Sequence, residues 1–336
     1  MIYIYHHTDD DGYASAATVI TYLILSHTIN DWNSSELKLI PYNYTKLNTF
    51  VPYDENDFSL GDSIYLVDLS VSTGTIEKFI NFIDLLYRRN CKFTWIDHHI
   101  SSLDDSFQVL LNKHFEQYNF EKYIDSNYCA AYNCCRYLLN YKLGMSVIPE
   151  IIRIIDDYDC WKLRLEGTKE FIVGFSLQDK HNPLNSDWYK WITQRDESIH
   201  IVKECIERGK IVNQWLSIDD TTKFNISAFE TTFCGLLCCA INVRRNSDIF
   251  RTDKDYDIYL SYIYNGDNYI YSIYSKKESV YCNKIAELFG GGGHKGAAGF
   301  TSNKLVVNKH KNLYYRYKDF KLTHKYRKLL KRNGDN

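Results

Sequence analysis

The chain has 336 residues, of which 45% are hydrophobic and 24% charged, and this composition is that of a globular protein with room for two domains. Its net charge of −2 hides an asymmetry, because residues 304–332 hold eleven Lys or Arg and one acid, while residues 1–303 hold 29 basic and 40 acidic residues. A body this acidic argues against a protein that binds long duplex nucleic acid, which requires a basic surface.

The sequence shows no sign of export or of membrane insertion. No stretch has about 18 uninterrupted apolar residues, and the first apolar residues run directly into acidic ones rather than into a signal-peptide cleavage site. The ten cysteines include no C-x-x-C pair, so we expect reduced thiols rather than a disulfide framework or a zinc site. These features predict a cytoplasmic protein with no membrane partner.

In the first half of the chain, short apolar runs alternate with helical stretches. Strands are predicted at residues 2–5, 37–40, 63–67 and 92–96, and helices at residues 13–26, 73–90, 130–141 and 149–155. Strands that alternate with helices are typical of parallel βαβ units. We therefore expect an α/β domain with a parallel sheet over residues 1–165.

The second half has a different pattern. Residues 166–217 are polar and helical, and we expect them to connect two domains. A smaller mixed α/β domain is expected over residues 218–303, with strands at 223–229, 234–241, 258–264 and 269–274 and a helix at 283–289. Residues 304–336 form a basic tail, which is either a solvated helix or a contact for nucleic acid or a partner.

Acids and histidines gather where the predicted strands end. They are His7, Asp9 and Asp11 after the first strand, Asp68 after the third, Asp97, His98 and His99 after the fourth, and Asp156, Asp157 and Asp159 after a later helix. Ligands of open parallel sheets bind at the carboxyl ends of the strands. Imidazole and carboxylate together suit Mn, Fe or Zn, and six such ligands are about right for two ions that share one carboxylate. Two such ions suit hydrolysis of a phosphoester.

A glycine run near the end of the chain suggests a phosphate contact. Gly290, Gly291, Gly292 and Gly293 are followed by His294 and Lys295. A backbone without side chains can approach a phosphate closely and present its amides to it. Taken alone, each of these patterns is more often a turn or a flexible loop. Taken together and in this order, they predict a metal-dependent enzyme that acts on a phosphorylated substrate.

The motifs resemble those of the DHH phosphoesterase superfamily with its DHH-associated C-terminal domain. The matching segments are His-Thr-Asp-Asp-Asp-Gly at residues 7–12, Val-Asp-Leu-Ser at 67–70, Asp-His-His at 97–99 and Gly-Gly-Gly-His at 291–294. The NrnB-like oligoribonucleases are the most similar branch. The resemblance implies an active site in the cleft between the two domains, two divalent ions (most often Mn²⁺), and it allows a homodimer.

The resemblance also implies roles for individual residues. His7, Asp9 and Asp68 would hold one ion, while Asp11, Asp68, His98 and an acid of the fourth cluster would hold the other, with Asp68 bridging them. Asp157 is the predicted fourth-cluster ligand, with Asp156 and Asp159 as alternatives. Asp97 would orient a ligand imidazole, and His99 would face the scissile phosphate. Gly291, Gly292, Gly293, His294 and Lys295 would bind a terminal phosphate or base. Residues 125–130 depart from the Ser-rich helix start of the family.

The predicted activity is exonucleolytic cleavage of short single-stranded RNA or DNA, of two to five units, to nucleoside 5′-monophosphates. A clamp of two domains would favour short substrates, and the acidic body has no basic groove for long ones. The alternatives are hydrolysis of cyclic or linear dinucleotide or cyclic mononucleotide signals, and dephosphorylation of phosphoadenosine phosphate. A non-catalytic nucleotide sensor belongs to a different class, and the intact ligand set argues against it.

Overall fold

The computed structural model describes residues 1–32, 35–43, 51, 53–54, 56–72, 74–103, 105–179, 181–309 and 313–332. The chain forms two compact units, residues 1–213 and 214–336, which are described separately below. The division falls within one long helix, α8 (Arg195–Ser227). The predicted domain boundaries at residues 165, 217 and 303 differ from this division and stay predictions.

The first unit alternates strands and helices as predicted. Its strands are β1 (Ile2–His7), β2 (Leu37–Tyr42), β3 (Ser63–Val67), β4 (Lys92–Asp97) and β5 (Glu121–Ile124). Its helices before α8 are α1 (Asp10–Leu25), α2 (Ile76–Arg88), η1 (Ile100–Leu103), α3 (Asp105–Tyr118), α4 (Ala130–Cys134), η2 (Cys135–Lys142), α5 (Glu150–Asp159), α6 (Thr168–Phe175) and α7 (Asp187–Thr193). Neither β5 nor α3 was predicted from the sequence. Residue 73, where a helix was expected to begin, lies outside the described residues.

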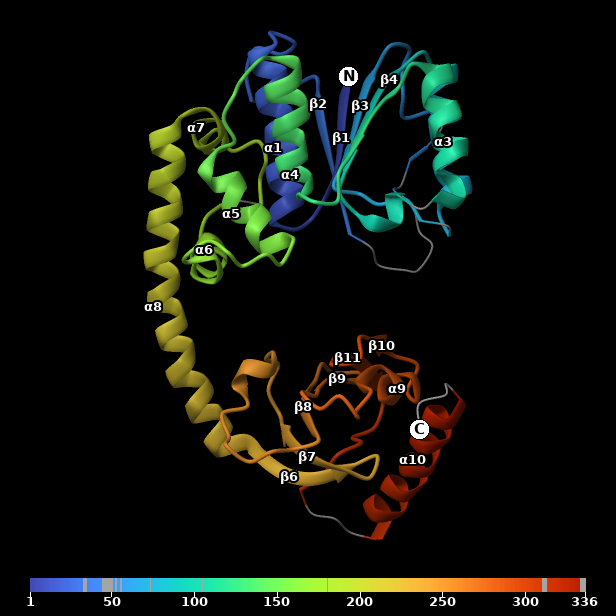
Figure 1. Cartoon of the computed structure of the whole chain (residues 1–336), viewed down its shortest axis with the longest axis vertical. Coiled ribbons are helices and arrows are strands. Elements are labelled where there is room, and N and C mark those ends of the chain that lie inside the picture. The colour runs from blue at the N-terminus through green and yellow to red at the C-terminus, as the bar shows by residue number, and fades with distance from the viewer. Residues whose placement is uncertain are drawn as a thin grey trace. The chain divides into compact units, whose positions relative to one another are not determined.

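The five strands form one parallel sheet in the order β2-β1-β3-β4-β5. Both faces of the sheet are covered, with α1 and α4 on one side and α3 on the other (Figure 1). In β1, Ile2 and Ile4 pack into the core on one face, while Tyr3 and Tyr5 pack into the core on the other. This alternation follows from the two-residue repeat of a strand. Because the strands are parallel, their carboxyl ends meet at one edge of the sheet.

Residues 166–213 pack onto the first unit. Phe171, Phe175 and Trp188 are fully buried in the same core as α1. The aromatic rings of Phe175 and Trp188 meet edge-on at 5.8 Å. Trp215, which follows on α8, is 60% exposed. Part of the segment expected to connect two domains therefore belongs to the core of the first unit.

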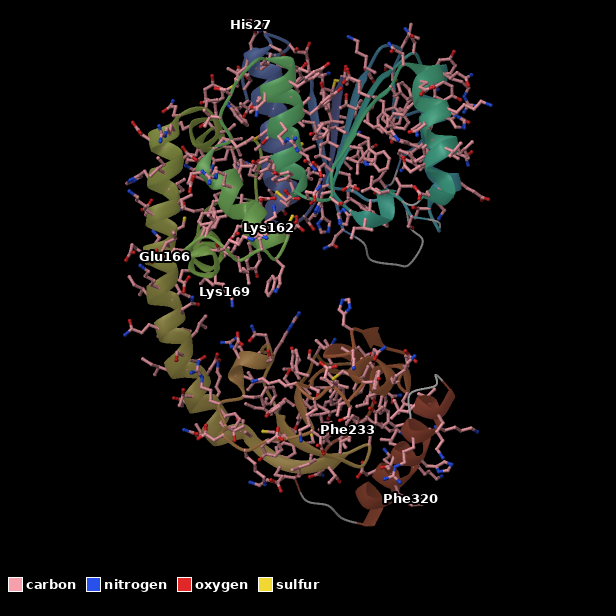
Figure 2. The ribbon with its side chains drawn as sticks, viewed as in Figure 1. His27, Lys162, Glu166, Lys169, Phe233 and Phe320 are labelled. Carbon is pink, nitrogen blue, oxygen red and sulfur yellow. The ribbon has the colours of Figure 1, made fainter. Side chains whose placement is uncertain are left out.

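The second unit is a mixed sheet in the order β10-β11-β9-β8-β7-β6, in which the β7–β8 pair alone is parallel. Its elements are β6 (Ala228–Phe233), β7 (Leu236–Ile241), η3 (Ser247–Ile249), β8 (Ile258–Tyr264), β9 (Tyr269–Tyr274), α9 (Cys282–Glu287), β10 (Gly292–Gly293), β11 (Ala297–Ser302) and α10 (Leu313–Arg332). The strand predicted at residues 223–229 is wrong, because α8 continues through most of it and β6 begins at Ala228. Phe233, labelled in Figure 2, lies in the core of this unit.

The basic tail is a helix from Leu313 to Arg332, α10, which packs on the second unit, whereas its residues 304–309 are not helical. Thr232 donates a hydrogen bond to Asp319 at 2.7 Å, and Tyr281 N donates to Tyr326 OH at 3.0 Å. Residues 310–312 and 333–336 of the predicted tail lie outside the described residues. A contact of this helix with nucleic acid or a partner stays a prediction. None of the described helices is long and apolar enough to cross a membrane.

Candidate metal centre

The carboxyl ends of β1, β3 and β4 carry most of the predicted ligands. After β1 the chain turns sharply, and Asp9 caps α1 by accepting a hydrogen bond from Gly12 N at 2.9 Å. A Cβ atom at Gly12 would lie 2.2 Å from the carbonyl oxygen of His7. Glycine is therefore required here for the turn that sets His7 and Asp9 side by side.

Asp68 occupies the centre of the cluster. It follows β3 with a φ of +55°, in the left-handed region that Asp tolerates better than most residues, and it is 1% exposed. Its Oδ2 lies 3.7 Å from His7 Nδ1, and its Oδ1 lies 3.3 Å from His98 Nε2. The two oxygens of one carboxylate thus face two different imidazoles, which is the disposition expected of a bridging ligand.

Each of these imidazoles has further carboxylates beside it. His7 Nδ1 lies 2.7 Å from Asp9 Oδ2. His98 Nε2 lies 3.7 Å from Asp11 Oδ2 and 3.5 Å from Asp159 Oδ2. The structure therefore brings His7, Asp9 and Asp68 into one group, and Asp68, His98, Asp11 and Asp159 into a second.

Asp11 is held in place by the start of α4. Its carboxylate oxygens accept hydrogen bonds from Ala130 N at 2.8 Å and Ala131 N at 2.7 Å. This is the region where the sequence departs from the Ser-rich helix start of the family. The backbone amides of a helix start stabilise a buried carboxylate whatever the side chains there are.

Asp157, the predicted fourth-cluster ligand, does not lie with these groups. Its carboxylate accepts hydrogen bonds from Arg164 N at 2.9 Å, Leu165 N at 3.1 Å and Thr168 Oγ1 at 2.6 Å. Asp156, one of the two alternatives, pairs with Lys162 at 2.6 Å. Both carboxylates are occupied with stabilising the loop after α5.

Asp159, the other alternative, faces the cluster from the end of α5. Its Oδ2 is buried and has no hydrogen-bond partner among the described residues. Three acidic side chains within the last turn of one helix could not be distinguished from the sequence, because a small change in where the helix ends exchanges which of them faces inward. The geometry favours Asp159 over Asp157.

The two histidines of the third motif, His98 and His99, have different partners. His99 Nδ1 lies 2.8 Å from Asp97 Oδ1, so Asp97 supports His99 rather than the imidazole of His98. Asp97 also accepts a hydrogen bond from Ser102 Oγ at 2.5 Å, and Asn133 Nδ2 donates to its carbonyl oxygen at 3.1 Å. Ser102 and Asn133 were not predicted, since neither belongs to a motif and only the fold brings them here.

The raised pKa values of the carboxyl groups in the cluster show that too few positive charges lie near them. Burial and the neighbouring carboxylates Asp11, Asp9 and Asp159 raise the pKa of Asp68 well above its ordinary value. Burial and the charge of Asp11 raise the pKa of Asp159 to about 7. Burial alone would lower the pKa of His98, but the Cys160 thiol and the carboxylates of Asp11 and Asp159 outweigh it and raise the pKa to about 10. Bound cations would compensate this charge.

The residues present fit divalent metal ions. Asp68 Oδ2 and Asp159 Oδ2 are buried without a hydrogen-bond partner among the described residues, and such atoms are costly unless a ligand satisfies them. The donors are a mixture of imidazole nitrogens and carboxylate oxygens, which suits Mn²⁺, Fe²⁺ or Zn²⁺. Cys160 Sγ, which was not predicted, can join His98 and Asp159 in a further group of three.

In the second unit the predicted substrate loop forms a tight hairpin. Gly291 N donates to Ala286 O at 3.0 Å, and His294 N donates to Ala297 O at 2.7 Å. Gly292 and Gly293 form β10, and Gly293 has a φ of +140°. The amides of Gly291 and His294 are therefore not available as phosphate donors, although the sequence analysis expected the amides of this loop to serve as such.

Lys295 of this loop forms an ion pair with Glu278 at 2.8 Å. Its Nζ also lies 4.7 Å from the centroid of the Tyr281 ring. The contact of Lys295 and of the exposed His294 with substrate stays a prediction.

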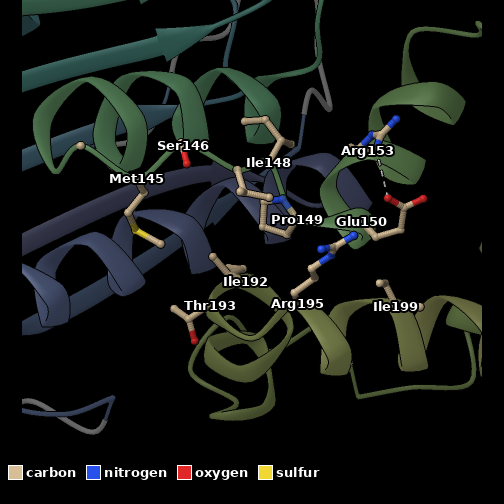
Figure 3. Close-up of a pocket in the computed structure, with 12 residues that line it drawn as sticks. Met145, Ser146, Ile148, Pro149, Glu150, Arg153, Ile192, Thr193, Arg195 and Ile199 are labelled. Carbon is tan, nitrogen blue, oxygen red and sulfur yellow. Dashed lines mark hydrogen bonds and ion pairs between the residues drawn. The ribbon is translucent and has the colours of Figure 1, made fainter.

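A cavity of about 660 Å³ lies elsewhere in the first unit, between residues 144–153 and residues 192–199 (Figure 3). Arg153 and Glu150 form an ion pair of 3.4 Å at its wall. None of the predicted site residues lines this cavity, so it is separate from the carboxylate cluster.

Comparison with known proteins gives remote likenesses. No family model matches the chain. An uncharacterized protein of Acanthamoeba polyphaga mimivirus is 24% identical over 249 residues, which cover 66% of this chain and 55% of that protein. The chain thus spans about half the length of this relative.

Several solved structures are similar to the chain at low sequence identity. The DHH domain of a member of the S1p family of ribosomal proteins has a TM-score of 0.47 and 13% identity, covering 98% of this chain and 86% of that one. A pGpG-specific phosphodiesterase from Vibrio cholerae has a TM-score of 0.45 and 11% identity over the whole of both chains. An exonuclease RecJ bound to manganese has a TM-score of 0.41 and 10% identity, covering 97% of this chain and 90% of that one.

Likenesses at these TM-scores decide nothing about substrate. The motif residues of the first unit do meet at one edge of its parallel sheet. The resemblance to the DHH phosphoesterase superfamily, like that to its NrnB-like branch, stays a prediction from the motifs.

Proposed function

We propose that this chain is a metal-dependent phosphodiesterase that hydrolyses short oligonucleotides, of two to five units, to nucleoside 5′-monophosphates. The observation that carries the proposal is the carboxylate of Asp68, whose two oxygens face His7 at 3.7 Å and His98 at 3.3 Å. His7, Asp9 and Asp68 would hold one ion, and Asp11, Asp68, His98 and Asp159 the other. Mn²⁺ is the proposed metal because imidazole and carboxylate donors are mixed.

Divalent ions bound there would supply Lewis acidity at the phosphate oxygens and make water nucleophilic near neutral pH. The remaining chemistry belongs to the side chains. His99 donates its Nδ1 proton to Asp97 at 2.8 Å, which leaves Nε2 as its outer nitrogen and holds the ring in one orientation. We propose that this nitrogen contacts the scissile phosphate and stabilises its developing charge.

The pKa of His99 supports this role. Burial lowers the pKa, but the hydrogen bond and charge of Asp97 outweigh burial and raise it. The raised pKa favours the protonated imidazole, which can donate to a phosphate oxygen. Asp97 in turn keeps a lowered pKa, because the bonds from His99 and Ser102 outweigh its burial. Asp97 therefore stays ionised and acts as the positioning residue for His99.

The second unit would bind one end of the substrate. We propose that the exposed side chains of His294 and Lys295 bind a terminal phosphate or base. A second point of attachment for one end of the substrate would favour short substrates over long ones.

The test is product analysis on a panel of substrates with Mn²⁺. The panel holds 5′-labelled RNA and DNA of two to twenty-four units, pGpG, cyclic dinucleotides, cyclic AMP and phosphoadenosine phosphate. Asp68→Asn serves as the inactive control, and metal content is measured for both proteins. Fast cleavage of two- to five-mers and slow cleavage of longer strands is the expected result. Activity confined to a cyclic nucleotide or to phosphoadenosine phosphate would overturn the proposal, as would a metal-loaded protein with no activity above the control.

A further inference from the structure

Trp161 lies exposed two residues after Asp159. It is 66% exposed, whereas the other tryptophans of the first unit, Trp32, Trp95, Trp188 and Trp191, are at most 9% exposed. Indole is one of the largest apolar side chains and is highly buried on average. Neither the metal chemistry nor the packing of the unit uses this exposed ring.

The backbone holds Trp161 in an unfavourable conformation. Its φ is +52°, and that of Leu163 is +48°. The left-handed region is a genuine outlier for bulky residues, and it persists only where the surroundings enforce it. The ring of Tyr158 meets the indole edge-on at 5.6 Å and supports it from one side.

Asp157 holds the backbone of this loop in its conformation. Its carbonyl oxygen accepts hydrogen bonds from Lys162 N at 2.9 Å and Leu163 N at 3.1 Å. Its carboxylate accepts three more from Arg164 N, Leu165 N and Thr168 Oγ1. One residue thus ties the whole loop after α5 to the helix. The exposure of Trp161 is therefore built into the loop and is not a consequence of a loose one.

Lys162 connects this loop to the metal centre. It lies in the turn after α5 (Figure 2), and its Nζ is 2.6 Å from Asp156 Oδ2 and 4.6 Å from the centroid of the Tyr128 ring. Asp156 also accepts a hydrogen bond from Cys129 N at 2.8 Å, next to the α4 amides that hold Asp11. An exposed aromatic ring and a cation therefore follow shortly after Asp159 in the chain, and the cation is bound to the carboxylate of Asp156.

We propose that Trp161 is a stacking platform for a nucleobase of the substrate, and this rests on the proposed function. An indole face stacks on any base, and a nearby ammonium suits the phosphates attached to it. The platform would make the enzyme select nucleotides over phosphodiesters without bases, and it would do so without a preference for one base. Asp157 acts as a positioning residue, because it holds the indole outward.

The experiment compares a dinucleotide, pApA, with its analogue in which both bases are replaced by abasic tetrahydrofuran units. KM and kcat are measured with Mn²⁺ for wild type, Trp161→Ala, Trp161→Phe and Trp215→Ala. Trp215 is the matched control, since it is 60% exposed but lies on α8. Circular dichroism verifies that each variant is folded.

The wild type is expected to have a lower KM for pApA than for the abasic analogue. Trp161→Ala should raise the KM for pApA about tenfold, with little change in kcat, and abolish most of the preference for bases. Trp161→Phe should retain most of the preference, and Trp215→Ala should behave as wild type. An unchanged KM ratio in an active Trp161→Ala enzyme would overturn the inference while leaving the proposed function intact.

If the wild type hydrolyses neither substrate, the proposed function fails and a binding measurement decides the inference. AMP is titrated with Mn²⁺ while tryptophan fluorescence is recorded. Quenching in the wild type that disappears in Trp161→Phe would support stacking on Trp161. Equal quenching in both proteins, or none, would overturn it.

Discussion

The contrast between Asp157 and Asp159 gives the sharpest prediction. The two residues lie two positions apart on one helix, and each is replaced by the isosteric amide, Asp157→Asn and Asp159→Asn. Asp157 accepts three hydrogen bonds from the following loop, whereas Asp159 Oδ2 has no hydrogen-bond partner among the described residues. The first substitution should therefore destabilise the metal-free protein, and the second should not.

The magnitude follows from the hydrogen bonds. Asparagine at position 157 places an NH₂ group where the carboxylate has an oxygen, and this group cannot accept a hydrogen bond from the N–H or O–H donors of the loop. At least one hydrogen bond is therefore lost, and one donor is left unsatisfied. The expected loss is about 2–4 kcal/mol of unfolding free energy. Asp159→Asn removes a charge from a cluster of like charges, so the metal-free protein should be as stable as the wild type or more stable. Its activity should fall by more than about 100-fold, since the variant loses a metal ligand.

Urea unfolding in EDTA, followed by tryptophan fluorescence, measures the first effect, and five of the six tryptophans belong to the first unit. Titration calorimetry with Mn²⁺ measures the second, and the number of ions bound should fall for Asp159→Asn alone. The reasoning is refuted if Asp157→Asn leaves the urea midpoint unchanged and loses an ion while Asp159→Asn keeps both.

Three further predictions test other parts of the site. Gly12→Ala would place a Cβ 2.2 Å from the carbonyl oxygen of His7, so it should lower stability by about 1–3 kcal/mol and weaken Mn²⁺ binding; unchanged thermal unfolding and calorimetry would contradict this. Asp97→Asn weakens the support of His99 and should lower kcat by about 10- to 100-fold with Mn²⁺ binding retained; loss of an ion instead would show that Asp97 serves the metal. Mn²⁺ at about 100 times its Kd should stabilise the protein over EDTA by about 2.7 kcal/mol for each ion bound, and a melting temperature that does not respond would argue against the centre.

The positions of four of the five strands along the chain, and the motif residues, could be predicted from the sequence because both depend on local patterns. Alternating apolar residues predicted β1, β3 and β4, and parallel pairing then placed the residues that follow them at one edge. His7, Asp68 and His98 meet there as predicted. The end of α8 was misassigned as a strand, because residues 223–229 have no local feature that distinguishes a helix end from an apolar strand.

The sequence by itself determined which chemical groups are present, and where along the chain they occur relative to strand ends. Only the tertiary structure decided which acid of the fourth cluster faces the centre, since Asp157 and Asp159 are alike in type and differ only in what the fold places around them. It also decided that Asp97 supports His99 and is itself held in place by Ser102 and Asn133. Contacts between residues far apart in the chain depend on how helices pack on the sheet, and no local pattern encodes that packing.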